Sequence, residues 1–264
     1  MRKEILFLGD SLTAGTIGSS YFKLLTQNKI LEEYSLINLG ENGFTIAGLR
    51  VKLEHYLQSN KAPSILVIEG GANDLLLPHM QNQGLHWDPF IRKLRRHGSV
   101  PAASVSAFRT QLNLLLGSAM DGGIPVVLLC TIPFLGEDLT SGLNRKREAY
   151  NAVIRTACRE SDSALFKCVI ADLAAGAEKI LSENVLEQKS DSDSCGPEAP
   201  GSWLFKAPAD FERDALRIRE TGEETLCRER GLRLSIDGAH PNRQGAALMA
   251  SVLLKTLREN SLLF

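Results

Sequence analysis

Short apolar runs alternate along the chain with longer segments in which apolar residues recur every three or four positions. The runs have the length of buried strands, and the longer segments have the spacing of amphipathic helices. Strands are expected at residues 4–8, 35–39, 64–68, 125–131 and 165–173. Alternating strands and helices predict βαβ units, whose right-handed crossovers place helices on both faces of a parallel sheet. The expected fold class is α/β, with three α/β/α layers and a parallel sheet of about five strands.

Apolar positions at helical spacing fill most of the segments between these runs. They occur at 21–31, 46–57, 105–119, 144–159, 174–187, 208–230 and 243–257. Thr45 and Asn242 stand where helix N-caps are preferred. We expect one charged amphipathic helix over residues 208–230. Its inward stripe comprises Phe211, Ala215, Ile218 and Leu226.

Two stretches depart from this alternation, and we interpret them as insertions in a single domain that spans residues 1–264. The first begins at Pro78, extends to about residue 103 and contains further prolines, polar turns and a basic cluster. The second covers about 188–233. Its first part, 188–202, is rich in Ser, Asp, Gly and Pro and is expected to be a flexible loop.

The balance of charge limits the kinds of partner. The chain has 264 residues, with 30 basic and 31 acidic side chains and a formal net charge of −1. A nearly neutral chain gives no electrostatic reason to expect binding to nucleic acid or to a membrane surface. We interpret the local basic cluster between Arg92 and His97 as a solvated face.

No apolar run is long enough to span a bilayer, so we expect no integral membrane segment. The N-terminus leads directly into the first strand and lacks a signal-peptide pattern with a small-residue cleavage site. A cytoplasmic location is therefore expected, unless a leader has been removed. Nothing in the sequence indicates an oligomeric state.

The five cysteines are odd in number and scattered. Cys130 and Cys168 fall in apolar, strand-like runs, which favours buried free thiols over disulfides. None of the five has the spacing of metal ligands. We therefore expect neither a metal nor another cofactor.

Polar residues with chemical potential follow three of the predicted strands and precede the last helix. Ser11 comes after the first strand, Gly40 after the second and Asn73 after the third, whereas Asp237 and His240 lie just before the final helix. The carboxyl ends of parallel strands meet at one edge of a sheet, where ligands bind in open α/β folds. We therefore expect these residues to converge.

The combination suits nucleophilic catalysis. A serine hydroxyl needs a base, and a histidine base needs a carboxylate on its other nitrogen. Ser11, His240 and Asp237 supply these three groups. The Ser11 N–H, the Gly40 N–H and the Asn73 amide are candidate donors to an oxyanion. Each residue alone could be an ordinary turn or cap residue, but together and in this order they indicate a catalytic site.

The same residues lie in four short blocks that resemble those of the GDSL, or SGNH, hydrolases. The blocks are Gly9-Asp10-Ser11-Leu12, Asn38-Leu39-Gly40, Gly71-Ala72-Asn73-Asp74 and Asp237-Gly238-Ala239-His240-Pro241-Asn242. The resemblance implies a flavodoxin-like SGNH-hydrolase fold and metal-free hydrolysis of esters, thioesters or acetylated sugars. It also implies Ser11 as nucleophile, His240 as base, Asp237 as its partner, and Gly40 and Asn73 as oxyanion donors. Both insertions are longer than the family core needs.

We therefore expect a serine hydrolase that cleaves small-molecule carboxylic esters through an acyl-enzyme intermediate. The alternatives are a deacetylase of acetylated carbohydrate, a thioesterase or lysophospholipase, and a binding protein without catalytic activity. Aromatic residues in the insertions suggest a rim that suits either an acyl chain or a sugar face. They are Trp87, Phe90, Trp203, Phe205 and Phe211. We expect the first insertion and the helix after Pro208 to lean together over Ser11.

Overall fold

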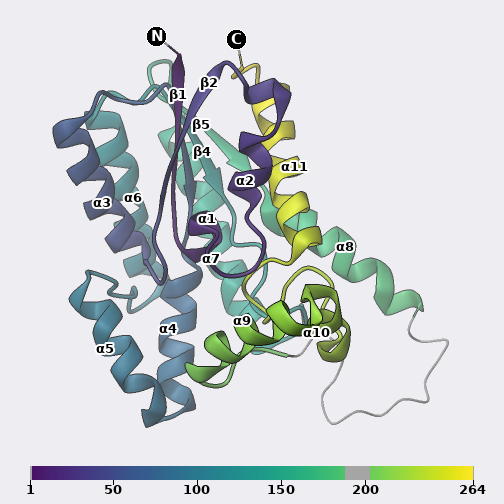
Figure 1. Cartoon of the computed structure of the whole chain (residues 1–264). Helices are drawn as coiled ribbons and strands as arrows, with labels where there is room; N and C mark the ends of the chain where they lie inside the picture. Colours follow the sequence, from purple (N-terminus) through teal and green to yellow (C-terminus); the bar gives the residue numbers. More distant parts are fainter. Residues whose placement is uncertain (1, 188–202, 264) are drawn as a thin grey trace.

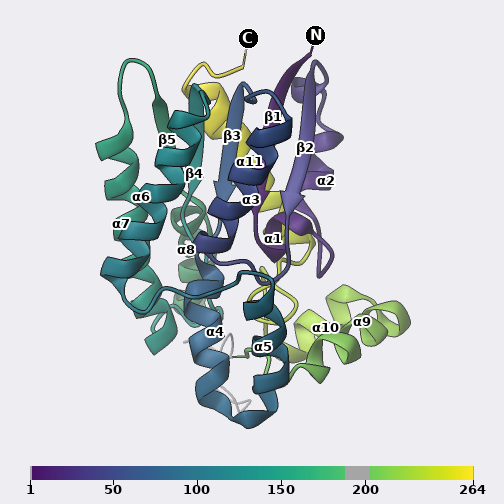
Figure 2. The same cartoon turned by 90° about the vertical axis from the view of Figure 1, so that its left-hand side faces the viewer.

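The computed structural model describes residues 2–187 and 203–263. Within them, a five-stranded parallel sheet with the order β2-β1-β3-β4-β5 lies between two layers of helices, as Figure 1 and Figure 2 show from two sides. The strands are β1 (Lys3–Gly9), β2 (Tyr34–Gly40), β3 (Ile65–Glu69), β4 (Val126–Cys130) and β5 (Lys167–Ala171). The predicted α/β/α fold class is confirmed.

The central strands are mainly apolar because both of their faces are covered. Strands β1 and β3 pair in register from Ile5↔Ile65 to Gly9↔Glu69. Successive side chains point to opposite faces, so Leu6 and Leu8 join one core while Ile5 and Phe7 join the other. The continuous apolar runs in the sequence thus have a direct structural cause.

Three helices cover each face of the sheet. One layer consists of α3 (Ile46–Ser59), α6 (Val105–Asp121) and α7 (Gly142–Ser161), and the other of α2 (Tyr21–Thr26), α8 (Leu173–Glu187) and α11 (Arg243–Glu259). The predicted caps are confirmed, because Thr45 accepts the Gly48 N–H at the start of α3 and Asn242 accepts the Gly245 N–H at the start of α11.

Shorter helices gather at the carboxyl edge of the sheet, below it in Figure 1. They are α1 (Ser11–Ala14), α4 (Ala72–Gln83), the 3-10 turn η2 (Leu85–Trp87), α5 (Asp88–Arg96), α9 (Ala209–Thr221) and α10 (Glu223–Arg230). The two expected insertions supply most of these helices. They therefore surround the edge at which the sequence places its polar residues.

Three helical segments differ from the sequence prediction by more than a few residues. Pro78 does not begin an irregular segment, because α4 continues through it to Gln83. A proline inside a helix loses one hydrogen bond, and the buried apolar face of α4 outweighs this loss. The helix expected over 21–31 ends at Thr26, and the 3-10 turn η1 (Lys29–Leu31) follows it.

The helix expected over 208–230 is two helices, separated at Gly222. Gly222 has a φ of +84°, which a continuing helix does not allow. Because the direction of the chain changes there, the residues expected to form one apolar face belong to two differently oriented helices. Ala215, one of these residues, is exposed. The loop expected at 188–202 lies outside the described residues.

The prediction that Cys130 and Cys168 are buried free thiols is confirmed. Cys130 and Cys168 are free and buried, as are Cys158 and Cys227. None of the helices in the described ranges is both long and apolar enough to cross a membrane.

Candidate active site

Ser11 stands at the junction between β1 and α1. The side chain of Asp10 caps α1 by accepting the Leu12 N–H at 3.0 Å. A Cβ on Gly9 would lie 2.0 Å from Thr13 Oγ1, so only glycine permits this tight turn. As the first residue of the helix, Ser11 has an N–H without an acceptor inside α1. The turn therefore presents both a hydroxyl and an N–H at the edge of the sheet.

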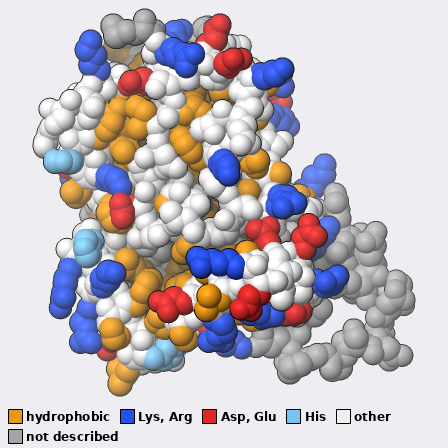
Figure 3. Space-filling model, viewed as in Figure 1, with side chains coloured by type: hydrophobic (Ala, Val, Ile, Leu, Met, Phe, Trp, Pro, Cys, Tyr) orange, Lys and Arg blue, Asp and Glu red, His pale blue; other side chains and the backbone are white. Residues whose placement is uncertain are grey.

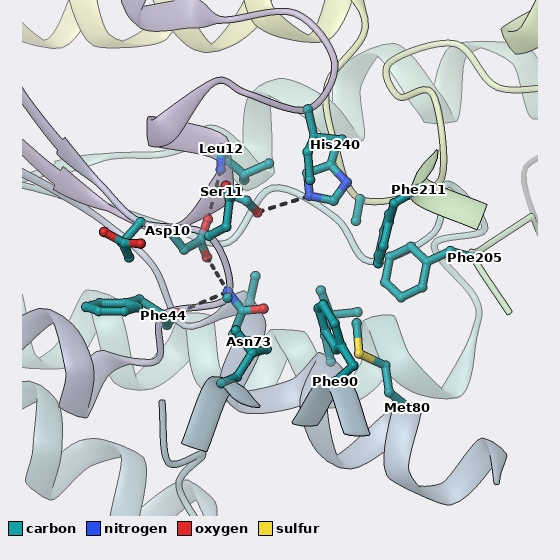
Figure 4. A pocket seen from close by; sticks show the side chains of 18 of the residues that line it. Asp10, Ser11, Leu12, Phe44, Asn73, Met80, Phe90, Phe205, Phe211 and His240 are labelled. Carbon is teal, nitrogen blue, oxygen red and sulfur yellow. Dashed lines mark hydrogen bonds between the residues drawn. The ribbon is translucent and has the colours of Figure 1, made fainter. Parts of the chain in front are cut away.

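His240 and Asp237 lie in the loop between α10 and α11. His240 Nε2 is 3.0 Å from Ser11 Oγ, and His240 Nδ1 is 2.6 Å from Asp237 Oδ2 (Figure 4). The Nδ1–H donates to the carboxylate, which leaves Nε2 free to accept the serine proton. The other carboxylate oxygen, Oδ1, accepts the N–H groups of Ala239 and His240. The structure thus brings the predicted serine, histidine and aspartate into one hydrogen-bonded chain.

The charges of this pair shift both pKa values. Burial works to lower the pKa of His240, but the Asp237 carboxylate outweighs burial and raises it. Burial likewise works to raise the pKa of Asp237, but the charge and hydrogen bonds of His240 lower it. The arrangement therefore strengthens His240 as a base and keeps Asp237 ionised.

Glu137, in the loop after β4, fastens the segment that carries these residues. Its buried carboxylate accepts the N–H groups of Arg233, Leu234 and Ser235 and the Ser235 hydroxyl, at 2.6–2.8 Å. The anchored residues lie two to four positions before Asp237. Sequence reasoning missed Glu137, because a single acidic residue in a loop carries no pattern.

Asn73 lies in the first turn of α4, beside Ser11 in the pocket (Figure 4). Its Nδ2 donates to Asp10 Oδ2 at 3.2 Å and to the Phe44 carbonyl at 3.0 Å. Both amide hydrogens therefore have acceptors. A bond to a substrate oxyanion would have to share or replace the longer of the two, the bond to Asp10.

Gly40 ends β2 at the carboxyl edge of the sheet, and its N–H already has an acceptor. Its N–H donates to Asn38 Oδ1 at 2.8 Å, and a Cβ there would lie 2.1 Å from the Ala14 nitrogen. Gly40 thus packs against α1, and it does not border the pocket. Gly43 borders the pocket instead, with a φ of +78°. The donor role expected of Gly40 stays a prediction, with Gly43, three residues later in the turn after β2, as the alternative.

A pocket of about 340 Å³ opens beside Ser11 and His240. Its walls are mainly apolar. The apolar side chains around it include Leu76, Met80, Phe90, Leu94, Phe205 and Phe211. In Figure 4, Met80 and Phe90 lie across the cavity from Ser11 and His240, and Phe211 and Phe205 form the side next to His240. The site therefore places a reactive hydroxyl at the end of an apolar chamber.

The aromatic wall joins the two predicted insertions. Phe211 of α9 lies 6.0 Å from Phe90 of α5 and 5.1 Å from Phe205, measured between ring centroids. Three of the five aromatic residues expected at the rim therefore lie in this wall, namely Phe90, Phe205 and Phe211. The other two differ: Trp87 is fully buried behind the wall, and Trp203 stacks on the guanidinium of Arg230.

Arg230 connects α9 to the catalytic loop. Its guanidinium forms a buried ion pair with Asp214 of α9 and donates to the Ile236 carbonyl at 2.6 Å. Asp214 is three residues from Phe211, which lies on the same side of α9. The position of the aromatic wall is therefore coupled to that of the loop that carries Asp237 and His240.

A second pair of carboxyl groups lies behind the nucleophile. Asp10 and Glu69 are both buried and hydrogen-bonded to each other, and Thr13 donates to Glu69 Oε2 at 2.9 Å. Burial raises the pKa of Asp10 to about 6, and burial together with the charge of Asp10 raises that of Glu69 well above its usual range. The pair therefore retains a proton where isolated carboxyl groups would have lost it.

Nothing in this site has the composition of a metal centre. Across residues 2–187 and 203–263, no three His, Cys, Asp or Glu side chains are placed to hold a metal ion. The charged or polar side chains at the pocket mouth are Glu41, Asn42, Lys93 and His97. The chemistry that the site offers is that of a serine activated by histidine.

One family model and several solved structures match the chain. The model of the GDSL-like Lipase/Acylhydrolase family matches residues 7–188. This range includes Ser11 and Asn73 but ends before Asp237 and His240. The comparison with curated proteins finds no match.

Solved structures share the fold at low sequence identity. The acetyl xylan esterase AlAXEase is 19% identical with a TM-score of 0.59, and the alignment covers 96% of this chain and 98% of that one. A catalytic mutant of Axe2, an acetylxylan esterase from Geobacillus stearothermophilus, is 15% identical with a TM-score of 0.61, covering 97% and 96%. A member of the lipolytic protein G-D-S-L family from Veillonella parvula is 16% identical with a TM-score of 0.57, covering 97% and 98%.

Proposed function

The chain belongs to the GDSL-like lipase/acylhydrolase family and is a hydrolase of carboxylic esters, and we propose that Ser11 is its nucleophile. The observation that carries the proposal is the hydrogen-bonded chain from Ser11 through His240 to Asp237. A hydroxyl, an imidazole and a carboxylate in this order form the arrangement that activates serine in hydrolases.

In the first half of the reaction, Ser11 Oγ attacks the ester carbonyl while His240 Nε2 takes the hydroxyl proton. Asp237 holds the Nδ1 proton and stabilises the imidazolium. His240 then gives the proton to the leaving alcohol as the carbonyl–oxygen bond breaks, which leaves Ser11 acylated. In the second half, His240 removes a proton from water, the water attacks the acyl group, and Ser11 recovers its proton as the acid departs.

The tetrahedral intermediate needs donors that are fixed before it forms. We assign the Ser11 N–H, the Gly43 N–H and Asn73 Nδ2 to this role, with Gly43 in place of Gly40. Gly43 borders the pocket from the turn after β2, on the side where Asn73 Nδ2 bonds to the neighbouring Phe44 carbonyl. Loss of one such donor typically lowers kcat about 10²–10³-fold.

The walls of the pocket favour an ester with an apolar acyl group larger than acetyl. Phe90, Phe205 and Phe211 offer aromatic surface, and Met80 offers a flexible apolar chain. Each methylene that such a group buries contributes about 0.8 kcal/mol. An acetyl group by itself would leave most of this chamber unfilled.

An acetylated carbohydrate is the second candidate. Two of the similar structures are acetylxylan esterases, and aromatic rings such as Phe90 and Phe211 can stack on the apolar face of a sugar. In this arrangement the sugar would occupy the chamber as the leaving group. The few polar side chains around the pocket count against it, because sugar hydroxyls need hydrogen-bond partners.

A substrate panel separates the two candidates. We would measure kcat/KM for p-nitrophenyl esters of increasing chain length and for acetylated xylo-oligosaccharides, with Ser11→Ala as the control. The proposal predicts an optimum beyond acetyl among the aryl esters, poor turnover of acetylated sugars, and nearly complete loss of all activity in Ser11→Ala. Preference for the acetylated sugars would instead support the second candidate, and wild-type rates in Ser11→Ala would exclude Ser11 as nucleophile.

A further inference from the structure

The mouth of the pocket carries positive charge from α5. Lys93 of α5 and His97, the C-cap of this helix, line the pocket together with the apolar Phe90 and Leu94. The helix has nine residues and contains four cationic side chains but one acidic one, Asp88. Its cations are Arg92, Lys93, Arg95 and Arg96. Figure 3 shows blue side chains gathered over α5, beside orange surface between this helix and α9.

These charges are not neutralised within the fold. Among the described residues, no carboxylate forms an ion pair with any of the four cations, and Arg95 donates to the neutral Gln81 Oε1 at 3.0 Å. The C-terminus of a helix favours positive charge through its dipole, which accounts for basic residues in the last turn. The dipole does not account for the placement of Lys93 and His97 along the wall of a reactive pocket.

The acidic side chain at the mouth does not cancel this charge. Glu41 lies there, but its carboxylate is bound to Lys52 at 2.8 Å. The other acid of the lining, Asp10, is fully buried beside Ser11. The mouth therefore keeps a net positive charge next to apolar walls. Such a surface focuses the electric field and attracts anionic substrates.

The place of α5 in the fold puts this charge on the side of the pocket that borders Gly43. A Cβ on Gly43 would lie 2.6 Å from the Leu94 side chain, so the end of α5 packs directly against the turn after β2. Lys93 precedes Leu94, and the His97 ring bonds through Nδ1 to the Lys93 carbonyl at 2.8 Å. The two residues thus form one unit at the side of the pocket that borders Gly43.

We propose that Lys93, assisted by His97, binds an anionic group of the ester substrate, a phosphate or carboxylate outside the bond that is cleaved. This inference rests on the proposed function and adds the charge of the substrate to it. The apolar chamber takes the acyl group, and the cationic mouth selects for an anion carried either by the leaving alcohol or by the far end of the acyl group.

The test compares esters that share one acyl group. One has a neutral phenol as leaving group, one has a phosphate on that phenol, and a third has the neutral phenol and a carboxylate at the end of the acyl chain. The measured quantity is the ratio of kcat/KM for each anionic ester to that for the neutral ester. The proteins are wild type, Lys93→Glu and the control Arg92→Glu. The control makes the same charge change on the same exposed helix, at a position outside the pocket lining.

Wild type should prefer one anionic ester by about fivefold or more at low salt, since about 1 kcal/mol is the scale of an exposed charge pair. Lys93→Glu should lower this ratio at least about tenfold, because attraction becomes repulsion, and Arg92→Glu should leave it within about twofold. High salt should reduce the wild-type ratio by screening. The ester that is preferred identifies whether the anion belongs to the alcohol or to the acid.

A wild-type ratio near one for both anionic esters would overturn the inference. An equal fall in Lys93→Glu and Arg92→Glu would also overturn it, because the effect would then come from the general field rather than from Lys93. The proposed function is judged separately, by turnover of the neutral ester and its dependence on Ser11.

Discussion

The ring of Phe211 meets the imidazole of His240 edge-on, with centroids 5.9 Å apart and an interplanar angle of 84°. Phe211 belongs to α9, whereas His240 lies in the loop before α11. An edge-to-face contact of this kind contributes about 0.5–1.5 kcal/mol beyond the area that it buries. The wall of the acyl chamber is therefore in direct contact with the proposed general base.

Phe211→Ala tests this wall. Removal of the ring opens the chamber and takes away apolar surface that a long acyl group would bury. We expect kcat/KM to fall about tenfold or more for the longer p-nitrophenyl esters and much less for the acetyl ester. Leu216→Ala is the matched control, since Leu216 is exposed on the same helix. Equal losses for short and long esters would show that Phe211 acts on His240 alone.

Glu137→Gln tests the anchor of the catalytic loop. The amide has the shape of the carboxylate, but its nitrogen cannot accept the Arg233 N–H, which leaves a buried donor unpaired at about 1–3 kcal/mol. We expect a lower Tm and a kcat reduced about tenfold with little change in KM, because His240 is then held less accurately. Asp138→Asn is the control, since the Asp138 side chain bonds within its own turn to Thr140. A normal kcat with a lower Tm would limit Glu137 to a structural role.

The acid limb of the pH profile should report His240. Its pKa is raised above 6.5, chiefly because the Asp237 carboxylate outweighs the effect of burial. The imidazole must be neutral to act as base, so kcat/KM should be lost as the pH falls through a value above 6.5. In Asp237→Asn the tautomer is no longer held, and turnover should stay low even at high pH. An acid limb unaltered in Asp237→Asn would assign the titration to another group.

Glu69→Gln tests how the buried carboxyl pair of Asp10 and Glu69 makes the stability of the fold depend on pH. Burial raises the pKa of Glu69 well above 4.5, so the folded protein binds more protons than the unfolded chain between these two values. Stability contributed by this group therefore falls as the pH rises through that window. Glutamine does not titrate, so the variant does not lose this stability as the pH rises. Its amide can still donate a hydrogen bond to Asp10. We expect the change in Tm caused by Glu69→Gln to be more favourable at about pH 8 than at about pH 5, by roughly 3 °C or more. The same change at both pH values would contradict the raised pKa.

Much of this site follows from the sequence because each element is specified locally. The apolar run before Gly9 ends in a turn, so the position of Ser11 at the end of the strand follows once the strand is recognised. Asp237 and His240 are three residues apart in a tight turn, and their pairing follows from that spacing. The parallel order of the strands then brings these groups to one edge.

Other features depend on geometry that a single sequence does not carry. Gly40 ends β2 and Gly43 follows in the next turn, and only the folded structure shows that Gly43 borders the pocket while the Gly40 N–H bonds to Asn38. Glu137 reaches the catalytic loop from almost 100 residues away. In contrast, the break at Gly222 has a signal in the sequence. A glycine inside a charged helical pattern is a common point for a helix to end, and it favours two helices over one.

Mass spectrometry of the acyl-enzyme tests the central claim most directly. Wild type is mixed with a p-nitrophenyl ester, quenched in acid within the first turnovers and digested, and the acylated peptide is sequenced. We expect one acyl group, attached to Ser11, and none in Ser11→Ala. Rapid turnover of the ester with the acyl group on another residue, or undiminished turnover in Ser11→Ala, would contradict it.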